Sequence, residues 1–304
     1  MAHQPIIKTE ALSYGYSRGA QTLTDINLRV ERGAIYGFLG PNGSGKTTTL
    51  SLLLGLLKLQ SGTIELFGKP LHADRSAILK KVGSLIESPS LYGHLTAREN
   101  LEIYRPLYGM PTTRIEEVLK MAGLQDTGRK PVRSFSLGMK QRLAIALALL
   151  PRPELLILDE PANGLDPSGI IELRELIRQL NKDHGMTILI SSHILAEVEK
   201  MVSHLGIIFN GRLLFQGSLQ QLHRLQHSGS QLELQTSDND AAMELLHTYR
   251  IERTGETLSL ALEDIGQAAA VNRLLIHNDL DVYLLQPRKT DLEQIFINLT
   301  TARP

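Results

Sequence analysis

The residues best suited to chemistry lie in a glycine-rich segment, residues 40–48, whose sequence is GPNGSGKTT. It fits the pattern G-x-x-x-x-G-K-[ST], in which N–H groups of a tight turn surround an anion and the next helix adds its positive N-terminus. We expect the Lys46 ammonium to reach the β- and γ-phosphates of a nucleotide and the Thr47 hydroxyl to bind Mg²⁺. An ordinary Gly-rich turn is the alternative, but the apolar residues 34–39 and 49–57 supply the strand and the helix that the pattern requires. The predicted nucleoside triphosphate site has these contact residues: Gly40, Pro41, Asn42, Gly43, Ser44, Gly45, Lys46, Thr47 and Thr48.

Two carboxylates, Asp159 and Glu160, follow a compact apolar run at residues 155–158. In open α/β sheets, ligands bind at the carboxyl ends of the strands. Asp159 is expected to hold Mg²⁺ through its water shell, and Glu160 to polarise the water that attacks the γ-phosphate. Two surface acids at a strand end are the alternative, and the phosphate-binding segment in the same chain favours the catalytic interpretation.

The elements that position these residues follow from the hydrophobic pattern. Apolar runs at residues 155–158 and 186–191 flank an amphipathic helix at residues 168–181. The order strand, helix, strand predicts a parallel sheet.

The remaining first part of the chain predicts two further kinds of structure. Residues 6–12 and 21–30 alternate apolar and polar side chains, as half-exposed antiparallel strands do, and a Gly-containing turn is expected at residues 12–17. A further strand is expected at residues 63–68. Residues 89–150 have a helical pattern. The fold class predicted is therefore α/β, with a parallel-sheet nucleotide-binding core, an antiparallel β subdomain and a helical subdomain.

The composition changes at the polar residues 227–230, which predict a linker between a first domain, residues 1–226, and a small α+β domain, residues 231–304. In the second domain, strands are expected at residues 231–236, 257–263 and 281–286, and helices at residues 240–249, 267–277 and 291–299. The second domain carries no phosphate-binding or metal-binding motif.

Bulk properties limit the classes of function. The chain has 304 residues, with 32 Lys plus Arg against 32 Asp plus Glu, so no overall basic field points to a nucleic acid partner. It contains no cysteine, which fits a reducing compartment, and residues 1–10 lack the apolar core of a signal peptide. No apolar run approaches the ~18 residues that span a bilayer. We expect a soluble, cytoplasmic protein.

Residues 133–142 open the helix expected at residues 139–149, and Ser136 is suited to be its N-cap. The free N–H groups of that turn could form a second anion site, although a simple capped helix is the alternative. With the phosphate-binding segment and the Asp159–Glu160 strand, this region resembles the nucleotide-binding subunit of ATP-binding-cassette (ABC) transporters over about residues 5–220.

The resemblance assigns residues 135–139, FSLGM, to the signature loop, usually LSGGQ. In that family the loop binds the γ-phosphate held by the opposite subunit. Leu137 and Met139 depart from the usual sequence, so only Ser136 and Gly138 are carried over as ATP contacts.

The resemblance implies three further roles. Tyr16 is expected to stack on adenine, with Tyr14 as the second candidate, although an exposed tyrosine without such a role is also common. Residues 163–167 are expected to form the D-loop, which contacts the partner subunit, with Asp166 at the nucleotide. His193 matches the switch histidine on the γ-phosphate.

Residues 82–89 lie where the family usually has a glutamine, and this chain has Glu87. We expect Glu87 to be a third metal ligand beside Thr47 and Asp159, the alternative being an incidental acid that faces solvent. The sequences SLIESPSLYGHLT and SLGMKQRL, together with the tail at residues 291–296, resemble the branch that exports bacitracin or confers lantibiotic immunity.

The resemblance therefore implies an ATPase subunit that dimerises around two Mg·ATP with a second copy of itself or a paralogous ATPase. It would drive separate membrane permease subunits, docked at residues 89–107, from the inner face of the cytoplasmic membrane. A soluble ABC ATPase acting on nucleic acid or ribosomes is the first alternative, but the chain has one phosphate-binding segment and no heptad run. The second alternative, a scaffold with a degenerate site, conflicts with the intact Lys46, Asp159, Glu160 and His193.

Overall fold

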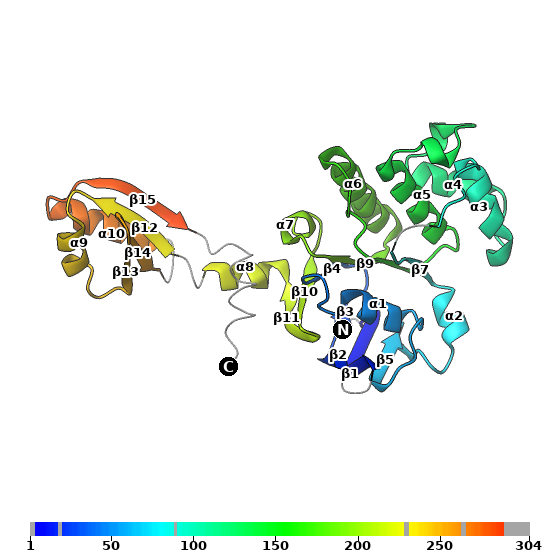
Figure 1. Cartoon of the computed structure of the whole chain (residues 1–304), viewed down its shortest axis with the longest axis horizontal. Coiled ribbons are helices and arrows are strands. Elements are labelled where there is room, and N and C mark those ends of the chain that lie inside the picture. Colours follow the sequence, from blue (N-terminus) through cyan, green and yellow to red (C-terminus); the bar gives the residue numbers. More distant parts are fainter. Residues whose placement is uncertain (1–3, 18–19, 88–89, 228–230, 263–265, 289–304) are drawn as a thin grey trace. The chain divides into compact units, whose positions relative to one another are not determined.

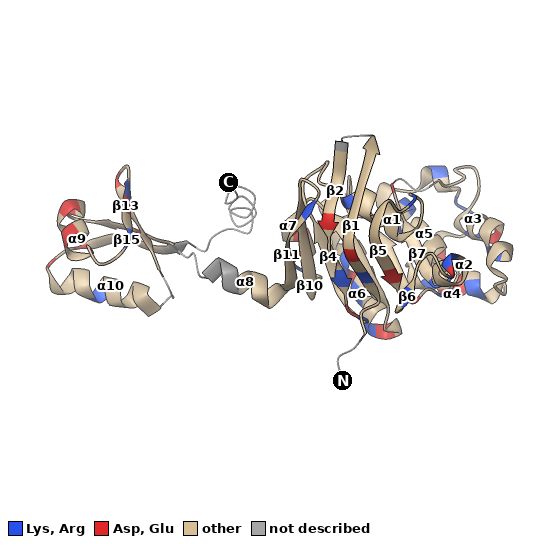
Figure 2. Ribbon diagram, turned by 90° about the horizontal axis from the view of Figure 1, so that it is seen from below, with Lys and Arg blue, Asp and Glu red and all other residues tan. Residues whose placement is uncertain are grey.

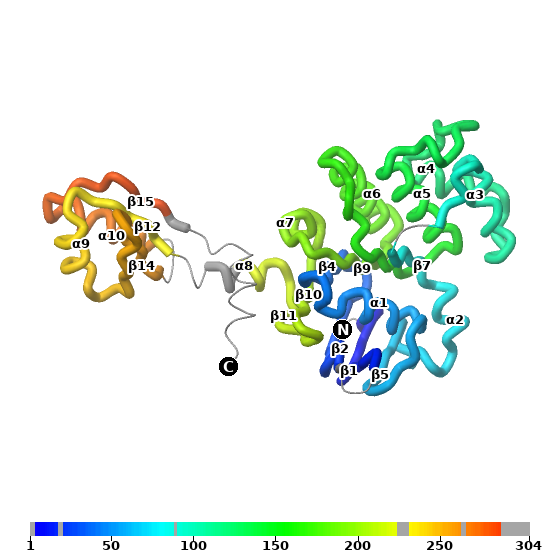
Figure 3. The backbone as a smooth tube through the Cα atoms, in the orientation of Figure 1, coloured from blue at the N-terminus to red at the C-terminus, as the bar shows by residue number. Residues whose placement is uncertain are grey.

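The computed structural model describes residues 4–17, 20–87, 90–227, 231–262 and 266–288. The chain divides into two compact units, Met1–Gly217 and Ser218–Pro304. Figures 1 and 3 follow each unit along the chain. The division falls after residue 217 rather than at residue 226, so helix α8 (Leu219–His227) belongs with the second unit.

A six-stranded sheet forms the centre of the first unit, in the order β11-β10-β4-β9-β8-β7. Neighbouring strands from β10 to β7 are parallel, as predicted. The bounds are β4 (Ile35–Leu39), β7 (Val82–Leu85), β8 (Leu155–Leu158), β9 (Thr187–Ser192), β10 (His204–Phe209) and β11 (Arg212–Ser218). Every residue of β4, β8 and β9 is buried, because helices or a second sheet cover both faces.

An antiparallel sheet lies on one side of the central sheet, with α1 (Lys46–Leu53) between the two (Figure 1). Its strands are β1 (Ile7–Ser17), β2 (Ala20–Ile26), β3 (Arg29–Val30), β5 (Ser61–Leu66) and β6 (Lys69–Pro70). Their inward side chains and the apolar side chains of α1, such as Leu50 and Leu53, share one hydrophobic core. The turn predicted at residues 12–17 is wrong, because β1 continues to Ser17 through irregular pairing with β2.

Helices α5 (Leu137–Leu149) and α6 (Pro167–His184) lie on the other side of the central sheet (Figure 1). The predicted helical subdomain consists of α3 (Ala97–Tyr104), α4 (Thr113–Met121) and α5, joined by short 3-10 turns. Two short helices complete the unit: α2 (Arg75–Leu79) and α7 (Leu195–Val198). Charged residues of both signs are spread over the elements of this unit (Figure 2).

The second unit contains a four-stranded antiparallel sheet, in the order β13-β14-β12-β15. Its elements run β12 (Gln231–Thr236), α9 (Asn239–Leu245), β13 (Ile251–Thr254), β14 (Thr257–Ala261), α10 (Gly266–His277) and β15 (Val282–Arg288). This is the β-α-β-β-α-β arrangement of ferredoxin-like domains. The unit has its own core, formed by side chains such as Leu234, Leu258 and Val271. The predicted α+β character is confirmed, and the helix predicted at residues 291–299 lies outside the described residues.

Candidate nucleotide-binding site

The phosphate-binding segment connects β4 to α1, as predicted. Gly45 has a φ of 107°, and a Cβ at this position would collide with the Leu23 side chain, so only glycine fits here. The Lys46 side chain is 5% exposed, and its Nζ donates hydrogen bonds to the carbonyl oxygens of Gly40 (2.8 Å) and Pro41 (3.2 Å). The ammonium is therefore held inside the loop where phosphate oxygens would lie.

Asp159, at the end of β8, is joined to the segment by a hydrogen bond. The Thr47 hydroxyl donates to Asp159 Oδ2 at 2.8 Å, so two of the three residues predicted to bind Mg²⁺ lie together. The Ser191 hydroxyl donates to Asp159 Oδ1 and accepts a hydrogen bond from the Glu160 N–H at 2.9 Å. Sequence reasoning misses Ser191, although its place at the end of the strand next to β8 is an available signal.

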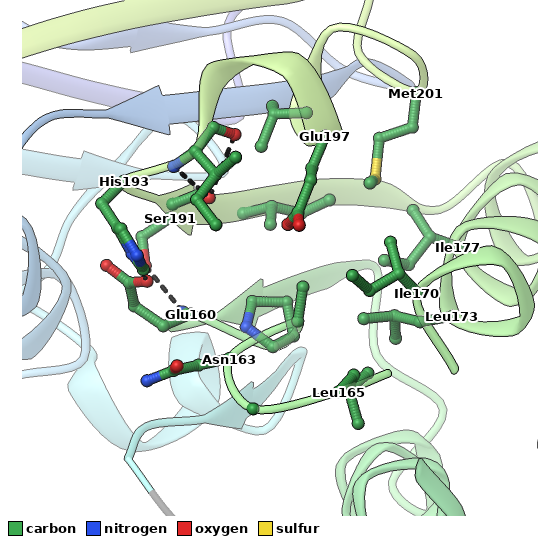
Figure 4. Close-up of a pocket in the computed structure, with 17 residues that line it drawn as sticks. Glu160, Asn163, Leu165, Ile170, Leu173, Ile177, Ser191, His193, Glu197 and Met201 are labelled. Carbon is green, nitrogen blue, oxygen red and sulfur yellow. Dashed lines mark hydrogen bonds and ion pairs between the residues drawn. The ribbon is translucent and has the colours of Figure 1, made fainter. Parts of the chain in front are cut away.

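Glu160 lies between two cationic or cation-forming groups. Its Oε1 is 3.0 Å from Lys46 Nζ, and its Oε2 is 2.5 Å from His193 Nδ1. Figure 4 shows the side chains of Glu160 and His193 pointing toward each other. The Glu160 carboxylate balances the positive charge of Lys46, and a bound triphosphate would compete for the same ammonium group. The structure thus brings Lys46, Glu160 and His193 together, as the sequence predicts.

A cavity of about 370 Å³ opens beside these groups. It is lined by Tyr16, Thr22, Asn42, Gly43, Gly45, Lys46, Thr47, Thr48, Glu160 and Asn163. Tyr16 lines the rim of this cavity and is 64% exposed. Its hydroxyl oxygen lies 3.3 Å from Thr48 Oγ1. Tyr14 packs edge-on against Tyr16 with 5.1 Å between ring centroids and does not line the cavity. The geometry favours Tyr16 over Tyr14 as the adenine platform, a role that stays a prediction.

Four other predicted residues do not join this cluster. Glu87 is exposed, has a φ of 59°, and makes no hydrogen bond or ion pair with the described part of the chain. Ser136 caps α5 by accepting from the Met139 N–H (3.2 Å). Asp166 caps α6 in the same way, and neither these two nor Gly138 lines the cavity. The contact of Ser136, Gly138 and Asp166 with a nucleotide remains a prediction, and so does the metal-binding role of Glu87.

Three features together are typical of a protein that hydrolyses nucleoside triphosphates. Lys46 is buried in a glycine-rich loop, Asp159 is hydrogen-bonded to Thr47, and Glu160 directly follows Asp159 in the sequence. The family model "ABC transporter" matches residues 23–163. The bacitracin transport ATP-binding protein BcrA of Bacillus licheniformis is 45% identical over 302 residues, 97% of each chain. The chain therefore belongs to the ABC transporter ATP-binding protein family and is an ATPase of that family.

Other comparisons agree with this family. The lantibiotic transport ATP-binding protein SrtF of Streptococcus pyogenes is 43% identical over 211 residues, 69% of this chain and 90% of its own. The structure of cbiO1 from Clostridium perfringens, part of the transporter complex cbiONQ, has a TM-score of 0.67 and 32% identity over 72% of this chain and 91% of its own. The dimeric cassette MJ0796, with ADP and Pi bound, has a TM-score of 0.62 and 25% identity over 70% of this chain and 98% of its own. Among the described residues, no helix is long and apolar enough to cross a membrane.

Proposed function

We propose that this chain powers the export of an antimicrobial peptide or a related compound through separate membrane subunits. The observation that carries the proposal is the cluster of Lys46, Glu160 and His193 beside the cavity. These three side chains can bind a triphosphate and activate the water that hydrolyses it. The substrate class is supported by the names of the bacitracin and lantibiotic transport relatives. Because those names refer to transport, this function is favoured over a soluble ATPase that acts on nucleic acid or ribosomes.

Mg²⁺ is the metal that the donor set fits. It usually takes one or two carboxylate or hydroxyl ligands from the protein and the remainder from water and phosphate oxygens. Thr47 Oγ1 and Asp159 Oδ2 lie 2.8 Å apart at the N-terminus of α1 and could supply these protein ligands. Bound there, Mg²⁺ would neutralise charge on the β- and γ-phosphates. Ser191 would hold the Asp159 carboxylate in place through its own hydrogen bond.

The chain's own residues would divide the work as follows. Lys46 binds the terminal phosphates in place of the Glu160 carboxylate, which lies 3.0 Å from its ammonium group. The freed Glu160 carboxylate accepts a proton from the attacking water. His193 keeps that carboxylate oriented or moves to the γ-phosphate. Positioning and electrostatic stabilisation supply most of the rate in phosphoryl transfer.

Partners are proposed on the same basis. Two subunits would enclose each Mg·ATP between the phosphate-binding segment of one and Ser136 and Gly138 of the other, an arrangement supported by the dimeric state of the MJ0796 cassette. The permease would dock on the helical subdomain near residues 89–107. A cavity of about 290 Å³ there is lined in part by Tyr104 and Tyr108, and Leu107 is 77% exposed. Permease binding would place the chain on the inner face of the cytoplasmic membrane.

The test is the substitution Glu160→Gln in the purified protein. Loss of the general base should slow ATP hydrolysis by roughly 10²–10⁴-fold while ATP still binds, and ATP-bound dimers should accumulate. Turnover by phosphate release and dimer content by light scattering are the measurements. Glu154→Gln, which removes an exposed glutamate paired with Lys81 and Arg32, is the matched control and should keep normal turnover. Normal turnover in Glu160→Gln would refute the proposed role of Glu160.

A further inference from the structure

Leu137, in the signature loop, packs against the D-loop of the same subunit. It is the first residue of α5 and is 50% exposed, beside the cap residue Ser136. A Cβ added at Gly164 would lie 3.1 Å from Leu137 Cδ2, so the leucine packs directly on the D-loop, residues 163–167. Gly138 also lies near this loop, because a Cβ there would be 3.9 Å from Leu165 Cδ2. The usual glycine at position 137 could not make the leucine's contact.

The D-loop also borders a second cavity. A cavity of about 110 Å³ lies between the loop, α6 and α7. Its apolar wall includes Leu165, Ile170, Leu173, Ile177 and Met201, which Figure 4 shows around one space. Side chains that line a cavity lack dispersion contacts on the side that faces it. The D-loop therefore contacts Leu137 and also lines a space into which it could shift.

The D-loop is also hydrogen-bonded to the backbone of the catalytic residue Glu160. The Asn163 N–H donates to the Glu160 carbonyl oxygen at 3.0 Å, and the Leu165 N–H donates to the Ala162 carbonyl oxygen at 3.1 Å. Asn163 lines the nucleotide cavity as well. A shift of the loop toward the second cavity would therefore move groups next to Glu160.

We propose that Leu137 is a positioning residue that holds the D-loop of its own subunit in the geometry that Glu160 needs and keeps the loop from shifting into the cavity that it lines. This role rests on the proposed ATPase function, since Ser136 and Gly138 on either side of Leu137 would meet the nucleotide of the second subunit. Closure of the signature loop on that nucleotide would then shift the D-loop, and the shift of the D-loop would change the geometry of the subunit's own catalytic site.

Hydrogen exchange of the nucleotide-free full chain tests the contact without ATP, so its failure is distinct from failure of the proposed function. Leu137→Ala should speed exchange of the Asn163 and Leu165 amides by about fivefold to tenfold, the shift expected when one partly buried leucine contact is lost. Leu137→Met should restore protection. Leu173→Phe, which fills the cavity, should slow exchange of the same amides.

Met139→Ala is the matched control, because residues two apart on a helix face different directions. It should leave D-loop exchange unchanged. In a second measurement, Leu137→Ala should lower kcat and leave the ATP affinity of the isolated subunit unchanged, since Leu137 does not line the nucleotide cavity. Unchanged D-loop exchange in Leu137→Ala, or an equal change in Met139→Ala, would overturn the proposal.

Discussion

Ser191 connects the Asp159 carboxylate to the backbone of Glu160. Its fully buried hydroxyl donates to Asp159 and accepts from the Glu160 N–H. Ser191→Ala should cost about 1–3 kcal/mol of unfolding free energy, because a buried N–H and a carboxylate oxygen each lose a partner. It should also raise the Mg²⁺ concentration needed for ATPase activity. Ser192→Ala, which removes the neighbouring hydroxyl bonded to Ile194, is the control, and equal urea midpoints for the two variants would contradict the prediction.

Glu87 remains a predicted metal-linked switch. Glutamate offers Mg²⁺ a carboxylate oxygen but lacks the amide donor of glutamine, and its charge near a triphosphate is tolerable only when metal neutralises it. Among the described residues the exposed Glu87 carboxylate has no partner, and its backbone φ of 59° is a strained conformation for a non-glycine residue. Glu87→Gln should change the Mg²⁺ dependence of ATPase and the coupling to transport, with ATP affinity at saturating metal little affected. Superimposable Mg²⁺ titrations would disprove the link.

At the scale of the element, long or fully buried segments are predictable from the sequence and short ones are not. The strands at residues 155–158 and 187–192 are continuous apolar runs, so length and flanking turns identify them. The sequence does not predict strand β13, because IERT has a single apolar residue and lacks a clear alternation. It also misplaces the end of β1, because Gly15 suggests a turn, whereas antiparallel pairing with Gln21 on the neighbouring strand β2 keeps the chain extended.

The site shows the same division. Packing between distant segments is set by tertiary structure and leaves no local pattern in the sequence. The sequence therefore gives no sign of the Leu137 contact with Gly164, which depends on how α5 packs on the D-loop. Motif spacing, in contrast, locates the residues that follow predictable strands: Lys46, Thr47, Asp159, Glu160 and His193.

Helix α3, which lies in the predicted permease-docking region, begins with a complete capping box. Thr96 Oγ1 accepts from the Glu99 N–H, and the Glu99 carboxylate accepts from the Thr96 N–H and hydroxyl. The backbone hydrogen bond, followed by the hydroxyl bond, lowers the pKa of Glu99 below its ordinary value. A lowered folded-state pKa stabilises the fold above the unfolded-state pKa, and this stabilisation is lost as the pH falls through the folded-state value.

Glu99→Gln should therefore lower the urea midpoint at pH 7 and converge with the parent protein in acid, below the ordinary pKa of about 4.5. Thr96→Ala should cost roughly 1 kcal/mol, the usual value of an N-cap. In the Thr96→Ala background, the further change Glu99→Gln should alter the pH dependence of the urea midpoint less than it does in the parent, because the hydroxyl donor is gone while the backbone N–H of residue 96 still donates to the carboxylate. A difference between Glu99→Gln and the parent that persists unchanged at low pH would show that the carboxylate is not the source of the effect.

At the scale of the whole molecule, a catalytic unit is joined to a second unit whose described residues include none of the nucleotide site. Each unit has its own hydrophobic core, one built around residues such as Phe38 and Leu50 and the other around Leu234 and Leu258. The lantibiotic relative matches over 69% of this chain and 90% of its own length, so that relative is the shorter of the two chains. We infer that the second unit regulates or steadies the dimer rather than taking part in hydrolysis.

Truncation after residue 227 tests this inference, because it keeps the whole nucleotide cavity and removes the β-α-β-β-α-β core. The shortened protein should fold, bind ATP with the affinity of the full chain, and form ATP-bound dimers less readily. Calorimetry should show two transitions for the full chain, since units with separate cores unfold independently unless a large interface couples them. A second truncation after residue 217 removes α8 as well, and the two products should be equally stable, because α8 belongs to the second unit. A folded truncation that no longer binds nucleotide would mean instead that the second unit helps to build the ATP site.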